Sequence, residues 1–301
     1  MSKLLVYGAY GYTGTLIAKL AGNLGLCPIL AGRNPEKCAA LATELGFETR
    51  AFDLDTPADV RQGLEDIAVV LHCAGPFSRT AKPMVDACIE TGTHYLDITG
   101  EVEVFEACAR RSAEASEATV MLMPGTGFDV VPSDCLAAHL KRRLPNATHL
   151  DLAFMGLKGG ISHGTATTMV ENIHRGSVVR RDGQLVSIST GSLSREVDFG
   201  RGPKRCMAIP WGDVSTAHHS TNIPNIAVYV PVPGFVRFGA RMSGAFGWLV
   251  GSNPVQRVLK NRIDARPPGP SDEQRASGKS ILWGEARDDE GTTVTSRLTT
   301  P

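Results

Sequence analysis

The sequence predicts an α/β protein, with a doubly wound parallel sheet followed by a second α+β domain that contains a mixed or antiparallel sheet. Up to about Met123, short apolar runs alternate with longer amphipathic ones, which is typical of βαβ units. Past Gly125, Gly, Ser and Thr become frequent, and runs of alternating polarity replace that rhythm. We therefore expect one domain over residues 1–125 and a second over residues 126–301.

The apolar runs of the first domain predict its strands, because parallel strands covered on both faces are apolar in the middle. We expect strands at 4–7, 28–31, 48–52, 69–72, 94–98 and 119–123. Helices are expected between them, at 13–24, 35–45, 57–64, 82–91 and 104–115, with Pro35 at a first helical position. In the second domain we expect strands at 147–154 and 226–231, helices at 133–143 and 167–174, and a hairpin over 280–300.

The charge and the cysteines exclude several classes of partner and site. Lys plus Arg and Asp plus Glu both number 31, so no strong field recruits nucleic acid. The seven cysteines are scattered and never form CxxC, which disfavours a disulfide framework and a metal site. The opening residues reach a turn at Gly8 before any leader-like apolar stretch. Together these features predict a cytoplasmic protein without a metal.

A glycine-rich loop lies between the first predicted strand and the first predicted helix. Gly8 lets the chain turn off the strand, Gly11 lets backbone N–H groups approach a pyrophosphate, and Gly14 lets the helix pack closely on the sheet. An ordinary glycine-rich turn is the alternative, disfavoured by the βα units that follow. The loop predicts a Rossmann domain that binds a dinucleotide, through Gly8, Tyr10, Gly11, Tyr12, Thr13 and Gly14.

The residue after the second strand predicts which dinucleotide is bound. An NAD-preferring domain usually places an acidic residue there, on the ribose hydroxyls, but this chain has Arg33. A guanidinium can pair with the 2′-phosphate of NADP, and Asn34 and Lys37 could add polar contacts. The alternative is a solvated surface charge. Asp53 and Leu54, after the third strand, are expected to line the adenine pocket, so we predict NADP(H) as the cofactor.

Several motifs give the chain a family resemblance. In order they are GAYGYTG at 8–14, AGRN at 31–34, CAGPF at 73–77, YLDITGE at 95–101, GFDVVPSD at 127–134, GGISHGT at 159–165 and GDVSTA at 212–217. The chain resembles the saccharopine dehydrogenase-like oxidoreductases, and its later motifs resemble the bacterial branch of trans-acting enoyl reductases. This resemblance implies an NADPH-dependent reductase with a Rossmann domain and a mixed second domain. His163 is a departure, because the family's pattern usually has glycine there.

Two loops are expected to frame the nicotinamide, because ligands of open α/β sheets bind outside the carboxyl ends of the strands. The first loop consists of Ala74, Gly75, Pro76 and Phe77, and the second contains Thr99 and Gly100. Phe77 offers an apolar surface that would shield the ring from water. The alternative is that Phe77 plugs the domain junction.

A hydride acceptor also needs a proton or an oxyanion site, and we select His163 and Glu101 as catalytic candidates. A histidine side chain ordinarily titrates near neutrality, which makes His163 a candidate, although a histidine in a glycine-rich turn is often only exposed. Asp97 and Asp129 are expected to hold loops by accepting backbone hydrogen bonds.

The segment 230–263 combines large apolar residues with a basic cluster that begins within it, at 257, and extends to 266. It could touch a membrane surface or line an acyl-chain entrance. Packing within the second domain or in a homodimer interface is the alternative that we prefer.

The sequence thus predicts an NADP-dependent reductase that transfers hydride to a polarised C=C, C=O or C=N bond of a small-molecule substrate, with an acyl or lipid-like compound as one candidate. A redox sensor that binds NADP(H) without turnover is the alternative from another class. Chemistry on amino acids is a further alternative, and it would need cations that converge on carboxylates. Arg175, Arg180, Arg181, Arg195 and Arg201 are the candidates for this role.

Overall fold

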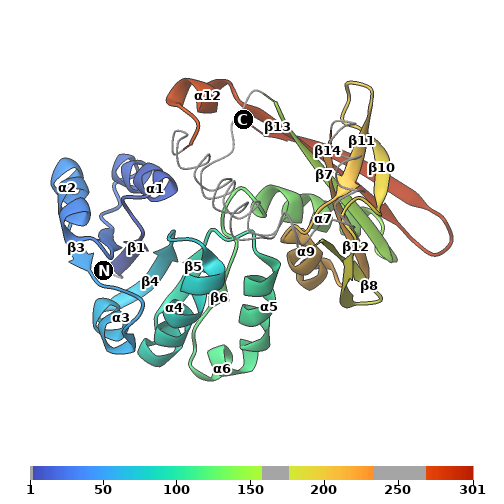
Figure 1. Ribbon diagram of the computed structural model, residues 1–301. Helices are drawn as coiled ribbons and strands as arrows, with labels where there is room; N and C mark the ends of the chain where they lie inside the picture. The colour runs from blue at the N-terminus through green and yellow to red at the C-terminus, as the bar shows by residue number, and fades with distance from the viewer. Residues whose placement is uncertain (1–2, 158–175, 233–268, 301) are drawn as a thin grey trace. The chain divides into compact units, whose positions relative to one another are not determined.

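The computed structural model of the protein describes residues 3–157, 176–232 and 269–300. The chain divides into two compact units, Met1–Asp129 and Val130–Pro301. Figure 1 shows the helices and strands of both units along the chain. Each unit is described by itself below.

The first unit is built on a six-stranded sheet in the order β3-β2-β1-β4-β5-β6. Every neighbouring pair of strands is parallel. This is the strand order of a dinucleotide-binding Rossmann sheet, with the reversal between β1 and β4. The strands are β1 Lys3–Tyr7, β2 Ile29–Gly32, β3 Thr49–Ala51, β4 Ile67–His72, β5 His94–Asp97 and β6 Leu122–Met123.

The helices of the first unit connect these strands. They are α1 Tyr12–Asn23, α2 Pro35–Leu45, α3 Pro57–Gly63, α4 Phe77–Thr91, α5 Val102–Arg110 and α6 Ser112–Glu117. Two differ from the prediction: α4 begins at Phe77 rather than at residue 82 and contains Pro83, and the helix expected at 104–115 is divided at Arg111. Prolines are typical of first turns, so Pro83 suggested a later start than the hydrogen bonds give.

Alternate residues of β1 are buried on opposite faces of the sheet, as the two-residue period of a strand requires. Leu5 and Tyr7 join a cluster with Val60, Met84 and other residues of α3, α4 and α5. Val6 joins a second cluster with residues of α1 and α2. The sheet is therefore covered on both faces, and its carboxyl edge is where a ligand can reach it.

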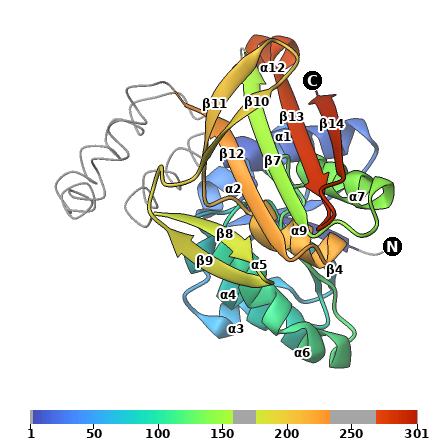
Figure 2. The same cartoon turned by 90° about the vertical axis from the view of Figure 1, so that its right-hand side faces the viewer.

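The second unit has a mixed sheet in which β8 pairs with both β12 and β9, beside the path β10-β11-β12-β7-β13-β14 (Figure 2). β7 and β12 are parallel, and the other pairs are antiparallel. This confirms the predicted fold class. The strands are β7 His149–Leu157, β8 Ser177–Arg181, β9 Gln184–Ile188, β10 Ser194–Asp198, β11 Pro203–Ala208, β12 Asn225–Pro231, β13 Lys279–Arg287 and β14 Thr293–Thr300.

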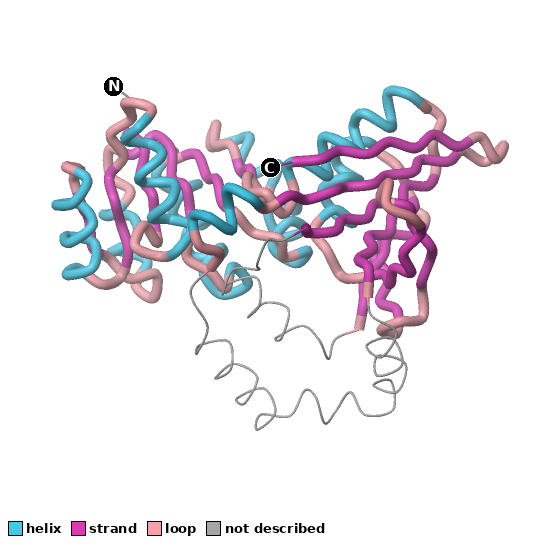
Figure 3. Tube along the Cα trace, turned by 90° about the horizontal axis from the view of Figure 1, so that it is seen from above, coloured by secondary structure: helices cyan, strands magenta, loops and turns pink. Residues whose placement is uncertain are grey.

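Three helices accompany this sheet in the described residues: α7 Val131–Arg143, α9 Asp213–Thr221 and α12 Asp272–Ser277. α7 and α9 pack on each other, α7 on β13 and β14, and α9 on β12. Figure 3 shows how the alternation of helix and strand in the first unit gives way to long neighbouring strands in the second. The predicted hairpin is present as β13 and β14, while the helix expected at 167–174 lies outside the described residues.

Candidate functional site

The glycine loop after β1 is closely packed against its neighbours. Gly8 has φ +80°, and the N–H groups of Gly8 and Ala9 donate to Ala31 O at 2.8 and 3.1 Å. A β-carbon at Gly14 would lie 2.3 Å from Gly8 O, and one at Gly8 would lie 2.9 Å from the β-carbon of Ala74. Glycine is therefore required at both positions, as the sequence analysis expected.

The same loop ends at the N-terminus of α1. Gly11 is the N-cap residue, is exposed, and supplies no side-chain cap. The first N–H groups of a helix have no intrahelical acceptor, and the positive end of the helix dipole favours an anion. No acidic side chain lies in the first turn, which contains Tyr12, Thr13 and Gly14. The loop therefore fits a pyrophosphate group.

Arg33 follows β2 directly and is exposed. Within the described residues its guanidinium makes no hydrogen bond or ion pair. Asn34 beside it is the N-cap of α2, and its Oδ1 accepts from the N–H of Lys37 at 2.8 Å. The ring of Tyr10 packs against Gly32, and Lys37 Nζ lies 5.8 Å from the centre of that ring. Two cations and an aromatic ring thus surround the end of β2.

Asp53 and Leu54 follow β3. One carboxylate oxygen of Asp53 accepts from the N–H of Asp55 at 3.0 Å, and Leu54 packs on the core. The hydroxyl of Tyr7 donates to Phe52 O at 3.0 Å. Burial, with the charge of Asp53, raises the pKa of Tyr7 well above its ordinary value, and the charge of Arg33 opposes that shift. Both charges therefore act at the carboxyl end of β1.

Asp97 connects the loops at the ends of β5 and β6. Its Oδ1 accepts from the N–H groups of Thr99 at 3.0 Å and Gly125 at 2.7 Å, and its Oδ2 accepts from the Tyr95 hydroxyl at 2.6 Å. The backbone carbonyl of Asp97 accepts from both the N–H and the hydroxyl of Thr126, each at 2.7 Å. Burial raises the pKa of the carboxyl, and these hydrogen bonds oppose the rise. Asp97 therefore holds loops, as its sequence context predicted.

Glu101 joins the two loops that were expected to frame the nicotinamide. Its two carboxylate oxygens accept from the N–H groups of Phe77 and Ser78, each at 2.9 Å. The carboxylate therefore caps α4, whose N-cap residue, Pro76, provides no side-chain cap. This contact gives Glu101 a structural role, and the proton-transfer role expected from the sequence stays a prediction. Because the contact joins two loops that lie far apart in the sequence, no local sequence pattern could have predicted it.

Phe77 is half-buried and packs on the core of its own unit. Its ring meets the imidazole of His72 edge to face, with 5.4 Å between ring centres and 86° between the planes. His72 is fully buried, and neither ring nitrogen has a hydrogen-bond partner among the described residues. Burial lowers the pKa of His72 to about 3, so the imidazole is neutral. No sequence pattern indicated a buried neutral role for this histidine.

Asp129 lies close to the second loop. A β-carbon at Gly100 would be 3.6 Å from a carboxylate oxygen of Asp129. Burial raises the pKa of this carboxyl to about 6, so it exchanges a proton near neutral pH. The sequence context of Asp129 predicts only that it holds a loop. Its position shortly after the last strand of a Rossmann sheet is the signal that could have identified it.

Other expected residues lie elsewhere or outside the described part of the chain. His163 falls within residues 158–175, and nearly all of the segment 230–263 falls within 233–268, so neither is described. The described residues contain no group of three His, Cys, Asp or Glu side chains that could hold a metal ion. Among the described residues, no helix is long and apolar enough to cross a membrane.

Two of the arginines proposed for carboxylate recognition have partners within the second unit. Arg195 pairs with Asp151 and with Glu285, the latter at 3.0 Å, and its guanidinium lies 4.6 Å from the Trp283 ring centre. Arg180 donates to the carbonyls of Val214 and Gly183, each at 2.7 Å. Neither residue is positioned as an open cation for a substrate carboxylate.

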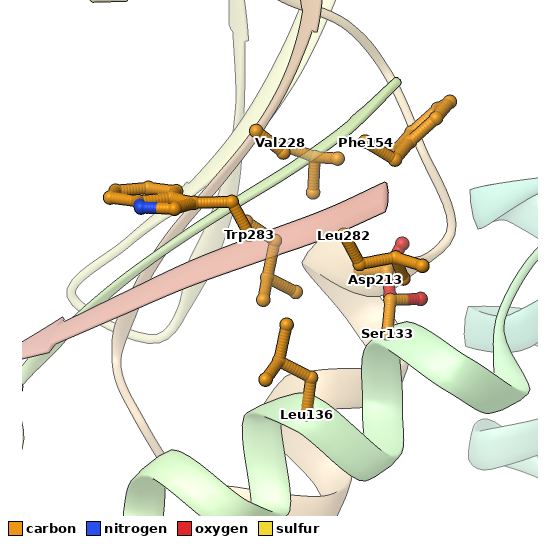
Figure 4. A pocket seen from close by; sticks show the side chains of 9 residues that line it. Ser133, Leu136, Phe154, Asp213, Val228, Leu282 and Trp283 are labelled. Atoms are coloured by element: carbon orange, nitrogen blue, oxygen red, sulfur yellow. The ribbon is translucent and has the colours of Figure 1, made fainter. Parts of the chain in front are cut away.

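The second unit also contains a narrow pocket between its sheet and the helices α7 and α9 (Figure 4). Ser133 and Asp213 contribute its polar groups, and both side chains are buried. The hydroxyl of Ser133 donates to Val130 O at 2.9 Å. The other lining residues are apolar: Leu136, Leu152, Ala153, Phe154, Val228, Leu282 and Trp283.

Comparison with known proteins agrees with this geometry. Residues 4–123 match the family model described as the saccharopine dehydrogenase NADP binding domain. A saccharopine dehydrogenase-like oxidoreductase of Bos taurus is 28% identical over 177 residues, which is 52% of this chain and 41% of that protein. A trans-acting enoyl reductase of Mycobacterium ulcerans is 30% identical over 151 residues, which is 47% of this chain and 36% of that protein. The chain thus spans less than half the length of these relatives.

A solved structure shows the same fold. It is apo saccharopine dehydrogenase (L-Glu forming) from Saccharomyces cerevisiae, which matches 100% of this chain and 85% of its own with a TM-score of 0.64 and 12% identity. The family match, the strand order and the glycine loop confirm the resemblance that the motifs predicted. Residues 4–123 are thus similar to the saccharopine dehydrogenase NADP binding domain, and this similarity covers less than half of the chain.

Proposed function

We propose that this protein is an NADP-dependent oxidoreductase that transfers hydride from NADPH to a polarised C=C, C=O or C=N bond. One observation supports this more than any other. An uncapped helix N-terminus after a closely packed glycine loop lies beside the exposed Arg33, which has no partner among the described residues, in a domain that matches a family model named for NADP binding. A pyrophosphate and a 2′-phosphate are the two anionic parts of NADPH that these features would bind.

The proposed roles of the other residues follow from the strand ends at which they lie. Gly8 to Gly14, including Tyr10, Tyr12 and Thr13, would hold the pyrophosphate, and Arg33 with Asn34 and Lys37 would hold the 2′-phosphate. Asp53 and Leu54 would line the adenine site. The loops 74–77 and 99–100 would receive the nicotinamide ring, from which NADPH supplies the hydride.

The reaction also needs a proton at the acceptor, and we assign this role to Asp129. Its carboxyl has a pKa of about 6, which is close to the ideal for a general acid that works near neutrality. Gly100 brings the second loop near that carboxyl without a side chain between them. His163 stays a second expectation for the same role.

An acyl or lipid-like acceptor is the substrate class that we favour. One relative is named a trans-acting enoyl reductase, and an enoyl group contains a C=C bond that the neighbouring carbonyl polarises. The amino-acid alternative loses two of its five candidate cations, because Arg180 and Arg195 are committed to contacts within the second unit. Homodimer formation and membrane contact through 230–263 stay predictions.

The test is a binding titration combined with a turnover screen. NADPH and NADH are titrated against the protein, and NADPH absorbance is then followed with enoyl thioesters, ketones and imines in turn. We expect micromolar or tighter NADPH binding and oxidation with at least one enoyl thioester. Oxidation by imines alone would contradict the substrate class. NADPH binding without oxidation by any compound of the panel would contradict the proposed enzymatic activity and favour a redox sensor.

A further inference from the structure

The N-terminus of α4 is capped by a residue from another loop. A helix that begins after a proline N-cap has no side chain at that position to accept its first N–H groups. Glu101 fills this place, with one carboxylate oxygen 2.9 Å from the N of Phe77 and the other 2.9 Å from the N of Ser78. A carboxylate at a helix N-terminus also interacts favourably with the helix dipole.

The backbone of Glu101 is itself held by a hydrogen bond within its own loop. Its backbone N–H donates to the hydroxyl of Thr99 at 3.0 Å, and the N–H of Thr99 donates to the buried Asp97 at 3.0 Å. A continuous series of hydrogen bonds therefore runs from the core of the sheet to the start of α4. Such a series fixes the position of the Glu101 backbone from which the carboxylate extends.

The first loop is tied to α4 as well. The hydroxyl of Thr80 approaches Ala74 O at 2.6 Å and Pro76 O at 3.1 Å. Thr80 fixes the loop to its own helix, whereas Glu101 fixes that helix to the neighbouring loop. The Glu101 carboxylate thus directly bridges the loop 74–78 and the loop 97–101.

We propose that Glu101 is a positioning residue, a latch that holds the loop 74–78 against the loop 97–101 so that the walls of the nicotinamide site are formed before the cofactor binds. This rests on the proposed function for the identity of the ligand. Both carboxylate oxygens accept backbone hydrogen bonds, which suits a latch better than a proton donor. A preformed site avoids the entropy cost of ordering a loop on binding.

The experiment compares two ligands in three variants. Glu101→Ala removes both acceptors, Glu101→Gln keeps one amide oxygen, and Glu117→Gln, at an exposed glutamate of α6, is the control. NADPH would contact both halves of the proposed site, whereas 2′-phospho-ADP-ribose lacks the nicotinamide. Backbone hydrogen exchange at Phe77 and Ser78 reports on the latch without any ligand.

We expect exchange at Phe77 and Ser78 to rise about tenfold in Glu101→Ala and less in Glu101→Gln, since one lost hydrogen bond is worth about a factor of ten. NADPH affinity should fall about tenfold, in proportion to the exchange, while 2′-phospho-ADP-ribose affinity stays within about twofold. The control should change neither quantity.

Unchanged exchange at the two amides would overturn the latch, and so would an equal loss of affinity for both ligands, which would indicate a general distortion. If Glu101→Ala does not fold, Glu101→Gln gives the same comparison. A wild-type protein that binds neither ligand would refute the proposed function. In that case the exchange at Phe77 and Ser78 would still decide whether Glu101 holds the loops together.

Discussion

The imidazole of His72 and the ring of Phe77 meet edge to face, with 5.4 Å between their centres, so a fully buried histidine supports the first residue of α4. Tyr7 and Tyr95 also contact the imidazole, at 5.5 and 6.2 Å between ring centres. The histidine thus has aromatic neighbours on several sides and no hydrogen-bond partner among the described residues. Its polar ring is more costly to bury than a hydrocarbon of similar size.

This environment predicts a specific pH dependence of stability. Burial lowers the pKa of His72 to about 3, against about 6.5 in the unfolded chain. His72 therefore does not lower the free energy of unfolding above about pH 6.5. As the pH falls below that value, the unfolded chain binds a proton that the folded chain does not, and the free energy of unfolding falls by up to about 1.4 kcal/mol per pH unit. His72→Leu should remove this loss and flatten the acid limb of the free energy of unfolding.

Denaturant unfolding of both proteins between about pH 6.5 and pH 4.5 measures the difference, because all other titrating groups are common to the two. His72→Phe is a second variant that keeps an aromatic ring beside Phe77. Parallel acid limbs in wild type and variants would show that His72 is not a buried neutral group.

A second prediction concerns the network of Asp97. Asp97→Ala leaves the N–H groups of Thr99 and Gly125 and the hydroxyl of Tyr95 without this acceptor, so we expect a loss of about 3 kcal/mol or more of unfolding free energy. Tyr95→Phe removes one donor from the network and should cost about 1 kcal/mol. Denaturant titrations measure both values, and similar small losses would contradict the central position of Asp97.

A third prediction concerns close packing in the glycine loop. A β-carbon at Gly14 would lie 2.3 Å from a backbone oxygen, so Gly14→Ala forces the loop to move. We expect a loss of about 2 kcal/mol in stability and a loss of NADPH binding. Gly22→Ala in the same helix is the matched control, since its nearest neighbour is the end of the Phe47 side chain at 3.3 Å. Equal effects at the two positions would contradict the account.

A fourth prediction concerns the proton donor. Asp129→Asn removes the ionisable group beside Gly100, so turnover with a responsive acceptor should fall at least about a hundredfold, and NADPH affinity should hardly change. In the wild type, turnover should fall as the pH rises through about 6, because the protonated form is the active one. A pH profile that is the same in both proteins would exclude Asp129 as the donor.

The sequence predicted the parts of the structure that depend on local patterns. Local backbone requirements explain three of these residues. Gly8 has a positive φ, Gly14 lies close to a neighbouring backbone oxygen, and Pro35 begins a helix. The apolar runs located all six strands of the first unit, because strands covered on both faces must be apolar. Strand order followed from the Rossmann pattern that these runs indicated.

The sequence could not predict contacts between residues that lie far apart in it. Glu101 was identified as a polar residue at a strand end, but its bond to the start of α4 depends on the fold. His72 looked like the last residue of an apolar strand, and only the fold shows that its imidazole is buried among aromatic rings, with no hydrogen-bond partner in the described part of the chain. Asp129 was expected to hold a loop, and its raised pKa follows from burial.

We expect Arg33 to select NADP over NAD, and the affinities of Arg33→Ala for NADPH and NADH would show whether it does. Arg110→Ala, another exposed arginine of the first unit, is the control. Charge-assisted hydrogen bonds to a phosphate are worth about 1.5–3 kcal/mol, so NADPH affinity should fall about 10- to 100-fold while NADH affinity is nearly unchanged. An equal loss for both cofactors, or no loss for NADPH, would contradict the claim.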